Sequence, residues 1–424
     1  MVTVHAPRAN HFLIRALTYL MFMMFAMTTD SVGVIIPEVI RTLHLSDTAA
    51  GAFHYASMSG IAVVAICLGF LADLLGRKWT TILGLVLFSL NSYLFAVTNS
   101  FAVFVTLLAV SGAAIGIFKT GALALIGDIS DSTQEHTSTM NTVEGFFGVG
   151  SIIGPLIVAR LLLEGVSWKW LYVIAGSLCV LLIIIASFVR YPHTARRSEE
   201  PINLRRTLRL LRNPFALAFS LACFLYVAVE CAIYVWLPTY LKDHKPSSAF
   251  MAAYVISIFF ILRAAGRFLG AWVTTRWNWT TVLVLFSGAI LTCFSGAMLG
   301  GANATVYLLA LSGVFMSVIY PTLNSKGISC FPKAEHGAVA GVLLFFTCLG
   351  AALGPLAMGV VSDLFGGLRA GFILATIFAA LLFLGLLYNW IANPTLKVLL
   401  RSDETEYGIA VRNQAEGDGA SISQ

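Results

Sequence analysis

Long apolar runs separated by short polar loops form the dominant pattern along the chain. A helix needs about 20 apolar residues to cross a bilayer. Read in windows of that length, the sequence predicts an all-α membrane protein with twelve membrane-spanning helices. These spans lie near residues 13–37, 48–73, 79–98, 101–127, 139–164, 168–190, 214–240, 249–275, 280–300, 304–328, 337–362 and 369–392.

The second half of this pattern repeats the first at an offset of 200 or 201 residues. KWTTIL at 78–83 returns as NWTTVL at 278–283, and GSIIGPLI at 150–157 returns as GAALGPLA at 350–357. LLAVSG, which begins at residue 107, returns as LLALSG. Parallel repeats with a substrate site between them are typical of secondary transporters that work by alternating access.

The repeat divides the chain into four parts. We expect two pseudo-symmetric six-helix bundles, 1–190 and 214–392, joined by a basic linker at 191–213. The remaining segment, 393–424, is polar, and its composition predicts a tail without fixed structure. The expected fold is therefore a pair of helical bundles with a short, charged connection between them.

Composition and charge support a membrane protein and set its orientation. The chain is 58% hydrophobic and only 11% charged, whereas a soluble protein is about 25% charged. Six arginines lie in the linker and GRK at 76–78 follows the second span, all on one side of a twelve-span chain. By the positive-inside rule, both termini lie in the cytoplasm. The net charge of +6 therefore indicates topology in a cytoplasmic membrane rather than a nucleic-acid surface.

Two acids occupy matching places in the first span of each half. Asp30 maps onto Glu230 at the repeat offset, and each precedes a proline by about two helical turns. Acids within membrane helices are costly and usually mark substrate or proton pathways. Lys119, in the fourth span, maps onto Tyr320 in the tenth. We therefore expect polar side chains at equivalent depths in the two halves.

The segment GFLADLLGRK at 69–78 resembles the loop signature of the major facilitator superfamily, which also lies between spans two and three. In this interpretation Gly69 allows close helix packing and Asp73 caps or pairs across the cytoplasmic mouth. Arg77 and Lys78 are expected at the membrane interface, with Gly76 beside them in the same gating motif. The resemblance implies the twelve-helix major facilitator fold.

More specifically, the chain is similar to the fucose–hexose:proton symporters. The similarity is carried by LYVAVECAIYVWLPTYL, GRFLGAWVTTRW, VFMSVIYPTLNSKGI and GPLAMGVVSDLFG, all in the second half. It implies that spans one, four, seven and ten line a sugar-sized cavity, and that a protonatable acid couples transport to the proton gradient. Family members often carry an acid where this chain has Lys119, and their first-span acid lies about one turn closer to the proline.

The buried charges suggest a proton switch. Lys119 and Asp30 belong to the same half, and we predict that they form an ion pair, either as a switch or as a structural bridge. Glu230 is the preferred proton carrier, with Asp30 as the second proton-coupling acid. Substrate contacts are predicted for Lys119, Tyr320, Tyr226, Tyr234, Trp236, Asn324 and Arg263.

The substrate itself is left open. A sugar taken up by proton symport is the preferred hypothesis. Because Arg263 and Lys119 could bind a carboxylate, a small organic anion such as a sugar acid is the alternative. Efflux by antiport is a further alternative, since GSIIGPLIVA at 150–159 partly matches an antiporter motif.

Other classes of protein find little support. The sequence contains no HExxH, GxSxG, Walker or dinucleotide-binding signature. We therefore expect no enzymatic activity, no cofactor and no metal. The expected partners are a small-molecule substrate, protons and the lipid bilayer, with the protein acting as a monomer.

Overall fold

The computed structural model describes residues 11–43, 47–192, 209–237, 240–241 and 246–406. The N-terminal half contains α1 (His11–Thr29), α2 (Val32–Leu43), α3 (Asp47–Leu68), α4 (Leu71–Leu74), α5 (Arg77–Val97), α6 (Phe101–Asp128), α7 (Thr133–Leu163) and α8 (Trp170–Phe188). The C-terminal half contains α10 (Pro214–Cys231), the π-helix η1 (Ala232–Trp236), α12 (Ala249–Arg276), α13 (Trp279–Ser329), the 3₁₀ turn η2 (Lys333–Glu335), α14 (His336–Phe365), α15 (Leu368–Ala392) and α16 (Leu396–Thr405).

These elements provide the twelve predicted crossings. Within the described residues, ten helices are long and apolar enough to span a membrane. One of them, the 51-residue α13, contains two crossings, because its path turns at Gly301, where φ is 71°. The remaining crossing, second in chain order, is α3, in which Tyr55–Leu68 forms a shorter apolar helix. The prediction of an all-α fold with twelve spans is confirmed.

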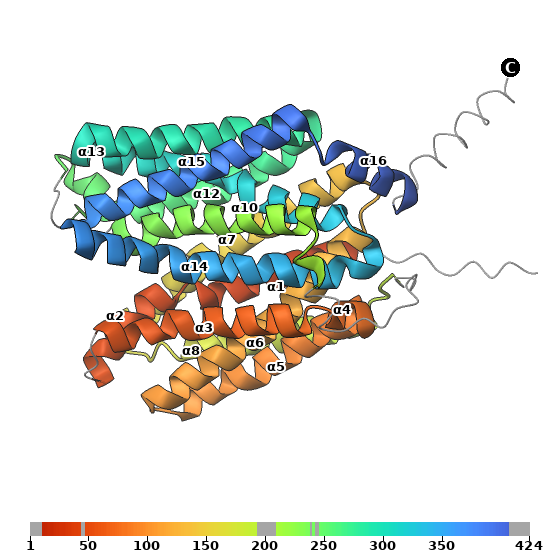
Figure 1. Ribbon diagram of the computed structural model, residues 1–424. Coiled ribbons are helices and arrows are strands. Elements are labelled where there is room, and N and C mark those ends of the chain that lie inside the picture. The colour runs from red at the N-terminus through yellow and green to blue at the C-terminus, as the bar shows by residue number, and fades with distance from the viewer. Residues whose placement is uncertain (1–10, 44–46, 193–208, 238–239, 242–245, 407–424) are drawn as a thin grey trace, which may run out of the picture.

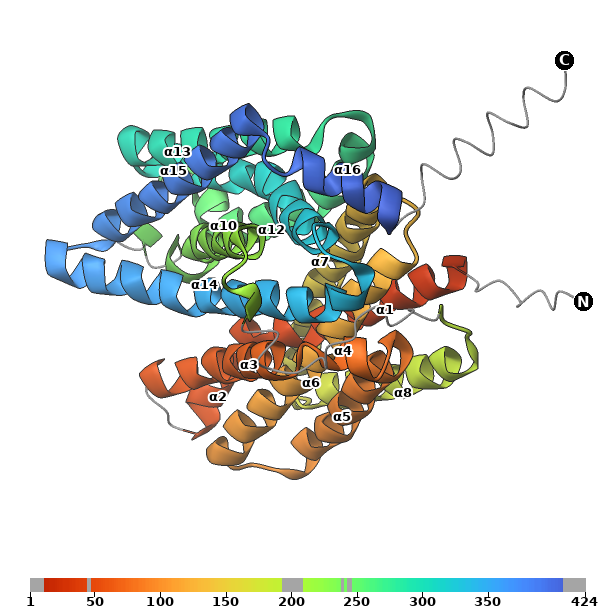
Figure 2. The ribbon, with the colours of Figure 1, turned by 45° about the vertical axis from the view of Figure 1, so that its right-hand side comes forward.

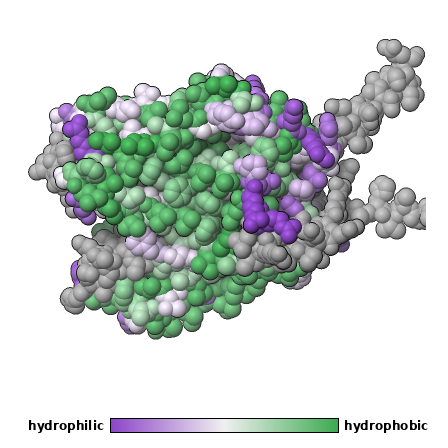
Figure 3. Space-filling model, in the orientation of Figure 1, coloured by the Kyte–Doolittle hydropathy of each residue, from purple (hydrophilic) through white to green (hydrophobic). Residues whose placement is uncertain are grey.

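The long helices run side by side and present apolar side chains outward. Figure 3 shows a broad hydrophobic band on the visible face, with hydrophilic residues collected toward its ends. Large apolar side chains such as Leu156, Leu181 and Ile373 are exposed within the helices, as expected where lipid replaces water. Polar caps start several helices, including Asn213, whose side chain accepts hydrogen bonds from Phe215 N and Ala216 N.

Both halves use the same glycine pairs to pack their first and fifth spans. A Cβ atom at Gly150 or Gly154 would lie 2.0 Å from the carbonyl oxygens of Met23 or Met27 in α1. In the second half, a Cβ at Gly350 would lie 2.5 Å from the carbonyl oxygen of Phe224 in α10. The repeated GxxxG-like spacing thus brings two helix backbones into direct contact in each half.

The start of α1 and the C-terminal helix α16 lie at the same end of the bundle (Figure 2). We call this end the inner end, because the positive-inside rule predicts that it faces the cytoplasm. Figure 1 shows most of the N-terminal helices below and most of the C-terminal helices above, with α7 and α14 running between them. These two helices pack across the boundary, α7 against α12 and α14 against α3.

The linker and the tail fall partly outside the described residues. Of the predicted basic linker at 191–213, the segment 193–208 lies outside them. The prediction that 393–424 lacks fixed structure is wrong for its first part, because Leu396–Thr405 forms α16. Leu399 and Ser402 of this helix are buried against the bundle, and packing rather than polar composition decides its conformation. Residues 407–424 lie outside the described part.

Candidate functional site

The first span of each half departs from regular α-helix beside its acid. In the N-terminal half, α1 ends at Thr29, α2 begins at Val32, and Asp30 lies in the turn between them. In the C-terminal half, Glu230 lies in the last turn of α10, directly before the π-helix η1. Local π-helix and broken helix are frequently found at functional sites, because they free backbone groups and redirect side chains. No pattern in the sequence predicts the π-helix.

Glu230 forms an ion pair with Arg263 of α12. Oε1 of Glu230 lies 2.6 Å from Nε of Arg263, and the two side chains are 7% and 13% exposed. The hydroxyl of Tyr226 lies 2.7 Å from the same carboxylate oxygen and 2.9 Å from the carbonyl oxygen of Met316. The positive charge of the guanidinium compensates the carboxylate, and the hydroxyl of Tyr226 donates a hydrogen bond to it. The C-terminal half therefore neutralises its own acid.

Asp30 has no cation within ion-pair distance among the described residues. Its carboxylate accepts hydrogen bonds from the hydroxyls of Ser151 in α7 and Thr29. Its charge also acts across the boundary between the halves on Arg263. Asp30 is half-buried, whereas its counterpart Glu230 is buried. The two acids thus occupy equivalent positions in different electrostatic surroundings.

The predicted ion pair between Lys119 and Asp30 is not found among the described residues, and for this structure that prediction is wrong. The ammonium of Lys119 instead lies 4.7 Å from the ring centre of Phe147 and 5.7 Å from that of Phe22. On α7, the Phe147 that contacts Lys119 and the Ser151 that contacts Asp30 are one helical turn apart, so the two charges lie on neighbouring turns without forming an ion pair.

Lys119 lies in α6, which packs against α14 of the C-terminal half. The side chain is half-buried, while the residues on either side of it in α6, Phe118 and Thr120, are fully buried. Its charge acts on Cys348 of α14 in the other half. Cation–π contacts compensate an ammonium only in part, by about 0.5–2 kcal/mol. Lys119 is therefore a charge in an apolar setting without a described carboxylate partner.

The remaining predicted substrate residues divide into buried and accessible ones. Tyr226, Tyr320 and Asn324 are buried, and the rings of the two tyrosines stack with their centres 6.1 Å apart. Tyr234 and Trp236, in the π-helix, are half-buried. Tyr234 Oη lies 2.7 Å from the sulfur of Cys231, and Trp236 Nε1 donates to the carbonyl oxygen of Pro355. In this state, only the latter two aromatics offer accessible surface.

A second buried ion pair joins the two halves. Arg267 of α12 is 2% exposed. It donates to the backbone carbonyl of Glu144 in α7 at 2.8 Å and lies 3.3 Å from the carboxylate of the same residue. Sequence reasoning assigned no role to Arg267, although it directly follows a glycine of the family-like segment GRFLG. Since Arg267 is one helical turn from Arg263, α12 supplies one arginine to each buried acid.

The gating motif closes the inner end. Asp73 accepts hydrogen bonds at 2.9 Å from the backbone N–H groups of Gly337 and Ala338, at the start of α14 in the other half. An anion at a helix N-terminus is favourable because the helix dipole and unpaired N–H groups point toward it. Burial raises the pKa of the Asp73 carboxyl, and Arg77 and the two amides oppose that shift. The predicted pairing of Asp73 across the mouth is present.

Arg77, predicted to lie at the membrane interface, is buried within the protein. Its side chain is 1% exposed and contacts Asp73 at 2.5 Å and Asp128 at 2.9 Å. It also donates to the backbone carbonyl of Lys333 in the other half. Two nearby carboxylates and a backbone carbonyl of the other half hold the guanidinium inside the protein.

The other motif residues match their expected roles more closely. Lys78 remains peripheral and donates to the carbonyl oxygens of Ser187 and Val189 at the end of α8. A Cβ atom at Gly69 would lie 2.9 Å from Cα of Gly341 in α14, so glycine is needed for this contact between halves. Gly76 has φ of 86°, in the left-handed region that favours glycine.

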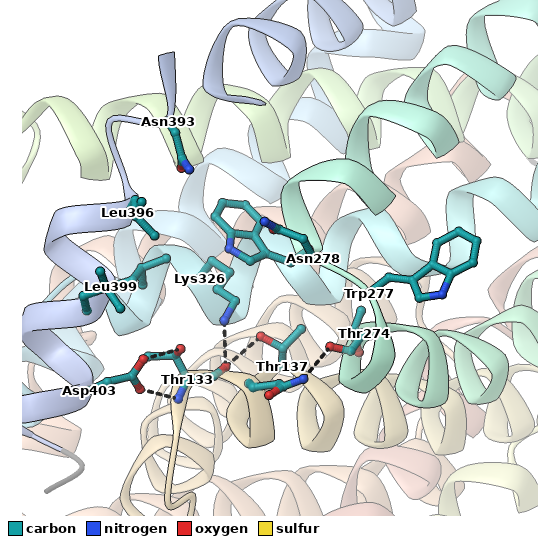
Figure 4. A pocket seen from close by; sticks show the side chains of 13 residues that line it. Thr133, Thr137, Thr274, Trp277, Asn278, Lys326, Asn393, Leu396, Leu399 and Asp403 are labelled. Carbon is teal, nitrogen blue, oxygen red and sulfur yellow. Dashed lines mark hydrogen bonds between the residues drawn. The ribbon is translucent and has the colours of Figure 1, made fainter. Parts of the chain in front are cut away.

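Further polar contacts extend this seal. His136 Nδ1 lies 2.8 Å from Ser329 Oγ, and the ring of His136 stacks on that of His336 with centres 6.2 Å apart. A cavity of about 280 Å³ lies beside these contacts, lined by α7, α13 and α16 (Figure 4). Lys326 lines this cavity, and its ammonium donates a hydrogen bond to the backbone carbonyl oxygen of Thr133.

The C-terminal helix closes one side of that cavity. Asp403 of α16 accepts a hydrogen bond from the backbone N–H of Thr133 at 2.9 Å, and its other carboxylate oxygen lies 3.2 Å from the Thr133 hydroxyl. Figure 4 shows these contacts next to the one made by Lys326. None of the three residues was predicted from the sequence to act in gating.

Two repeated helical bundles, sealed together at one end and carrying charged side chains within an apolar band, define an integral membrane transporter. Residues 18–355 match the family model of the Major Facilitator Superfamily. The chain belongs to that superfamily, whose members are transporters rather than enzymes. The multi-pass membrane location expected from the sequence follows from this membership.

The individual relatives share only about a quarter of their residues with this chain. The chain is 24% identical over 411 residues to the L-fucose-proton symporter of Escherichia coli (strain K12), covering 87% of this chain and 91% of that protein. It is also 24% identical over 389 residues to a 4-hydroxybenzoate transporter of Pseudomonas aeruginosa, covering 81% and 85%. The predicted resemblance to fucose-type symporters is confirmed.

Among solved structures, the fold is similar to that of the transporter FucP, crystallised in the outward conformation. The TM-score is 0.76 at 21% sequence identity, covering 89% of this chain and 99% of that one. At this identity the likeness establishes the fold alone.

Proposed function

We propose that this protein is a proton-coupled secondary transporter that takes up a small polar solute of about sugar size. One observation carries the proposal: the two repeat-related acids have different partners. Glu230 is paired with Arg263 at 2.6 Å, whereas Asp30 contacts only hydroxyls and acts on the same arginine from the other half. Arg263 therefore neutralises one of the two acids directly, and the other acid is left to be neutralised by a proton.

This arrangement favours Asp30 as the group that takes up the proton in the state described. The sequence favoured Glu230 for that role, and both remain proton-coupling residues in the proposal. Movement of α12 relative to α1 would change which acid Arg263 neutralises, because α12 belongs to the C-terminal half and α1 to the other. Proton binding and the position of the two halves would thereby depend on each other.

The seal at the inner end supports an outward-facing state. The gating motif, the Glu144–Arg267 pair and the contacts of Thr133 all join the halves near that end. Tyr234, Trp236, Lys119 and Asp30 are all half-buried in this state. A solute arriving from outside would meet these side chains before reaching the closed seal.

The test uses purified protein in liposomes that contain a pH-sensitive dye. A panel of neutral sugars and sugar acids is added outside, and a transported solute is expected to acidify the lumen. Asp30→Asn should abolish this acidification and still exchange labelled solute for unlabelled solute across the membrane. Wild-type acidification by Asp30→Asn would contradict its role, and solute uptake without any proton movement would contradict symport.

A further inference from the structure

We infer that the transported solute carries a net negative charge, and that Lys119 is the group that binds it. This inference rests on the proposed function and adds the chemical class of the substrate. It starts from the charged side chains that are buried or half-buried midway along the helices. The relevant residues are Asp30, Glu230, Glu144, Lys119, Arg263 and Arg267.

Four of these six charges neutralise one another in pairs. Arg263 lies beside Glu230, and Arg267 lies beside Glu144, with each pair buried. Asp30 and Lys119 remain, and they are not paired with each other among the described residues. An isolated charge away from water is unfavourable by several kcal/mol unless it is compensated or neutralised.

Asp30 and Lys119 reach neutrality by different routes. Asp30 faces the hydroxyl of Ser151 from α7 and the charge of Arg263 from α12, and a bound proton removes its charge. Lys119 faces two phenylalanine rings, one from α1 and one from α7. None of these groups supplies a formal negative charge to the ammonium, so a ligand anion is the missing partner.

The position of Lys119 suits this role. Its helix, α6, packs against α14 of the other half, the side chain is half-buried, and its repeat partner Tyr320 is buried in the opposite half. The apolar rings around the ammonium lower the local dielectric and strengthen a contact with a carboxylate. Tyr234 and Trp236 provide accessible aromatic surface on the C-terminal half. A sugar acid combines the hydroxylated body and the carboxylate that these groups would recognise.

The charges then balance over one transport step. The proton on Asp30 removes one negative charge from the site, and the anion at Lys119 compensates its positive charge. The loaded carrier is neutral at these two positions, and one proton moves inward with one monovalent anion. Uptake is therefore electroneutral, and a membrane potential alone does not drive it.

The experiment compares D-gluconate, D-galactonate and D-glucuronate with D-glucose, D-galactose and L-fucose in liposomes containing the full chain. Lumenal acidification and electrical current on a supported membrane are recorded together. We expect at least one sugar acid to give acidification without current. The neutral sugars should give neither signal.

Lys119→Gln and Lys119→Arg test the site itself. The first removes the charge while keeping a similar length, and should weaken binding of the active sugar acid at least about 30-fold, because loss of a desolvated charge partner costs 2 kcal/mol or more. The second keeps the charge and should retain most of the affinity. Thermal unfolding without solute verifies that both variants are folded.

The outcomes separate this inference from the proposed function. Proton-coupled uptake of a neutral sugar, or unchanged affinity for the sugar acid in Lys119→Gln, would overturn the anion assignment and leave symport intact. Uptake of a sugar acid with a current and no acidification would refute proton coupling and leave the anion site standing. If no solute of either class is transported, both are refuted.

Discussion

The two halves of this transporter share their packing and differ in their charges. In both halves, a glycine without a side chain (Gly150 or Gly350) lets the fifth span contact the backbone of the first span. Glu230 is neutralised by an arginine from its own half, whereas its counterpart Asp30 is not. The repeat thus preserves the contacts that build each bundle, while the side chains at the boundary have diverged. The proposed proton coupling depends on this asymmetry.

The largest expected effects come from neutralising the two acids separately. Asp30→Asn and Glu230→Gln should each abolish solute accumulation driven by a proton gradient, while leaving exchange at equilibrium. Only Glu230→Gln should also lower thermal stability, since it leaves Arg263 buried without its partner. Accumulation assays and melting curves on both variants measure the difference. Equal loss of stability in the two would contradict the assigned asymmetry.

Removing the arginine should have the next largest effect. Arg263→Leu leaves the Glu230 carboxylate buried and unpaired, and we expect a loss of about 3–5 kcal/mol in the free energy of unfolding. The double variant Arg263→Leu with Glu230→Gln should recover most of that stability without recovering transport. Chemical unfolding in detergent provides the measurement, and a stable Arg263→Leu single variant would show that the ion pair contributes little.

Glycine substitutions compare the packing of the halves. Gly154→Ala would place a Cβ atom 2.0 Å from the carbonyl oxygen of Met27, and Gly354→Ala would place one 2.7 Å from Ala228. Both should destabilise by about 1–3 kcal/mol, more at Gly154, because the backbone contact there is closer. Gly385→Ala is the matched control, since no atom lies within 4 Å of its added Cβ. Equal stability of all three variants would argue against glycine-dependent packing.

The smallest effect is expected at the repeat partner of Lys119. Tyr320→Phe removes one hydroxyl from a buried ring and should cost about 1 kcal/mol of stability. It should leave the preference between charged and neutral solutes unchanged, since the hydroxyl carries no formal charge. Competition binding by the sugar acid and the neutral sugar measures that preference. A changed preference would show that Tyr320, and not Lys119, distinguishes charged from neutral solutes.

The fold was accessible from sequence because its signals are local or periodic. The length of the spans, the 200-residue repeat and the motif around Asp73 can each be recognised from the order of residues alone. The site was less accessible, because pairing depends on helix rotation and depth. Lys119 and Asp30 are predicted to pair because they share a half, but Asp30 contacts Ser151 instead and Lys119 contacts two phenylalanine rings. The partner of Arg267 lies in the other half, which no local pattern indicates.

Buried arginines and the tail illustrate the same limit. Arg77 lies in a segment that is typical of the cytoplasmic interface, yet Asp128 and the Lys333 carbonyl draw it into the protein. The polar composition of 393–424 concealed α16, because few apolar residues suffice when a helix covers an existing surface. In each case the deciding contact comes from a distant part of the chain.

The C-terminal helix α16 forms hydrogen bonds that affect how the inner end can open. Asp403 holds Thr133 of the opposite half, and Glu406 accepts from the backbone N–H of Lys333. When the inner end opens, α16 must release Thr133 or travel with it, once in every turnover. In the proposed cycle, the strength of the α16 contacts would therefore affect how fast the inner end opens, and changes in this helix would alter the transport rate.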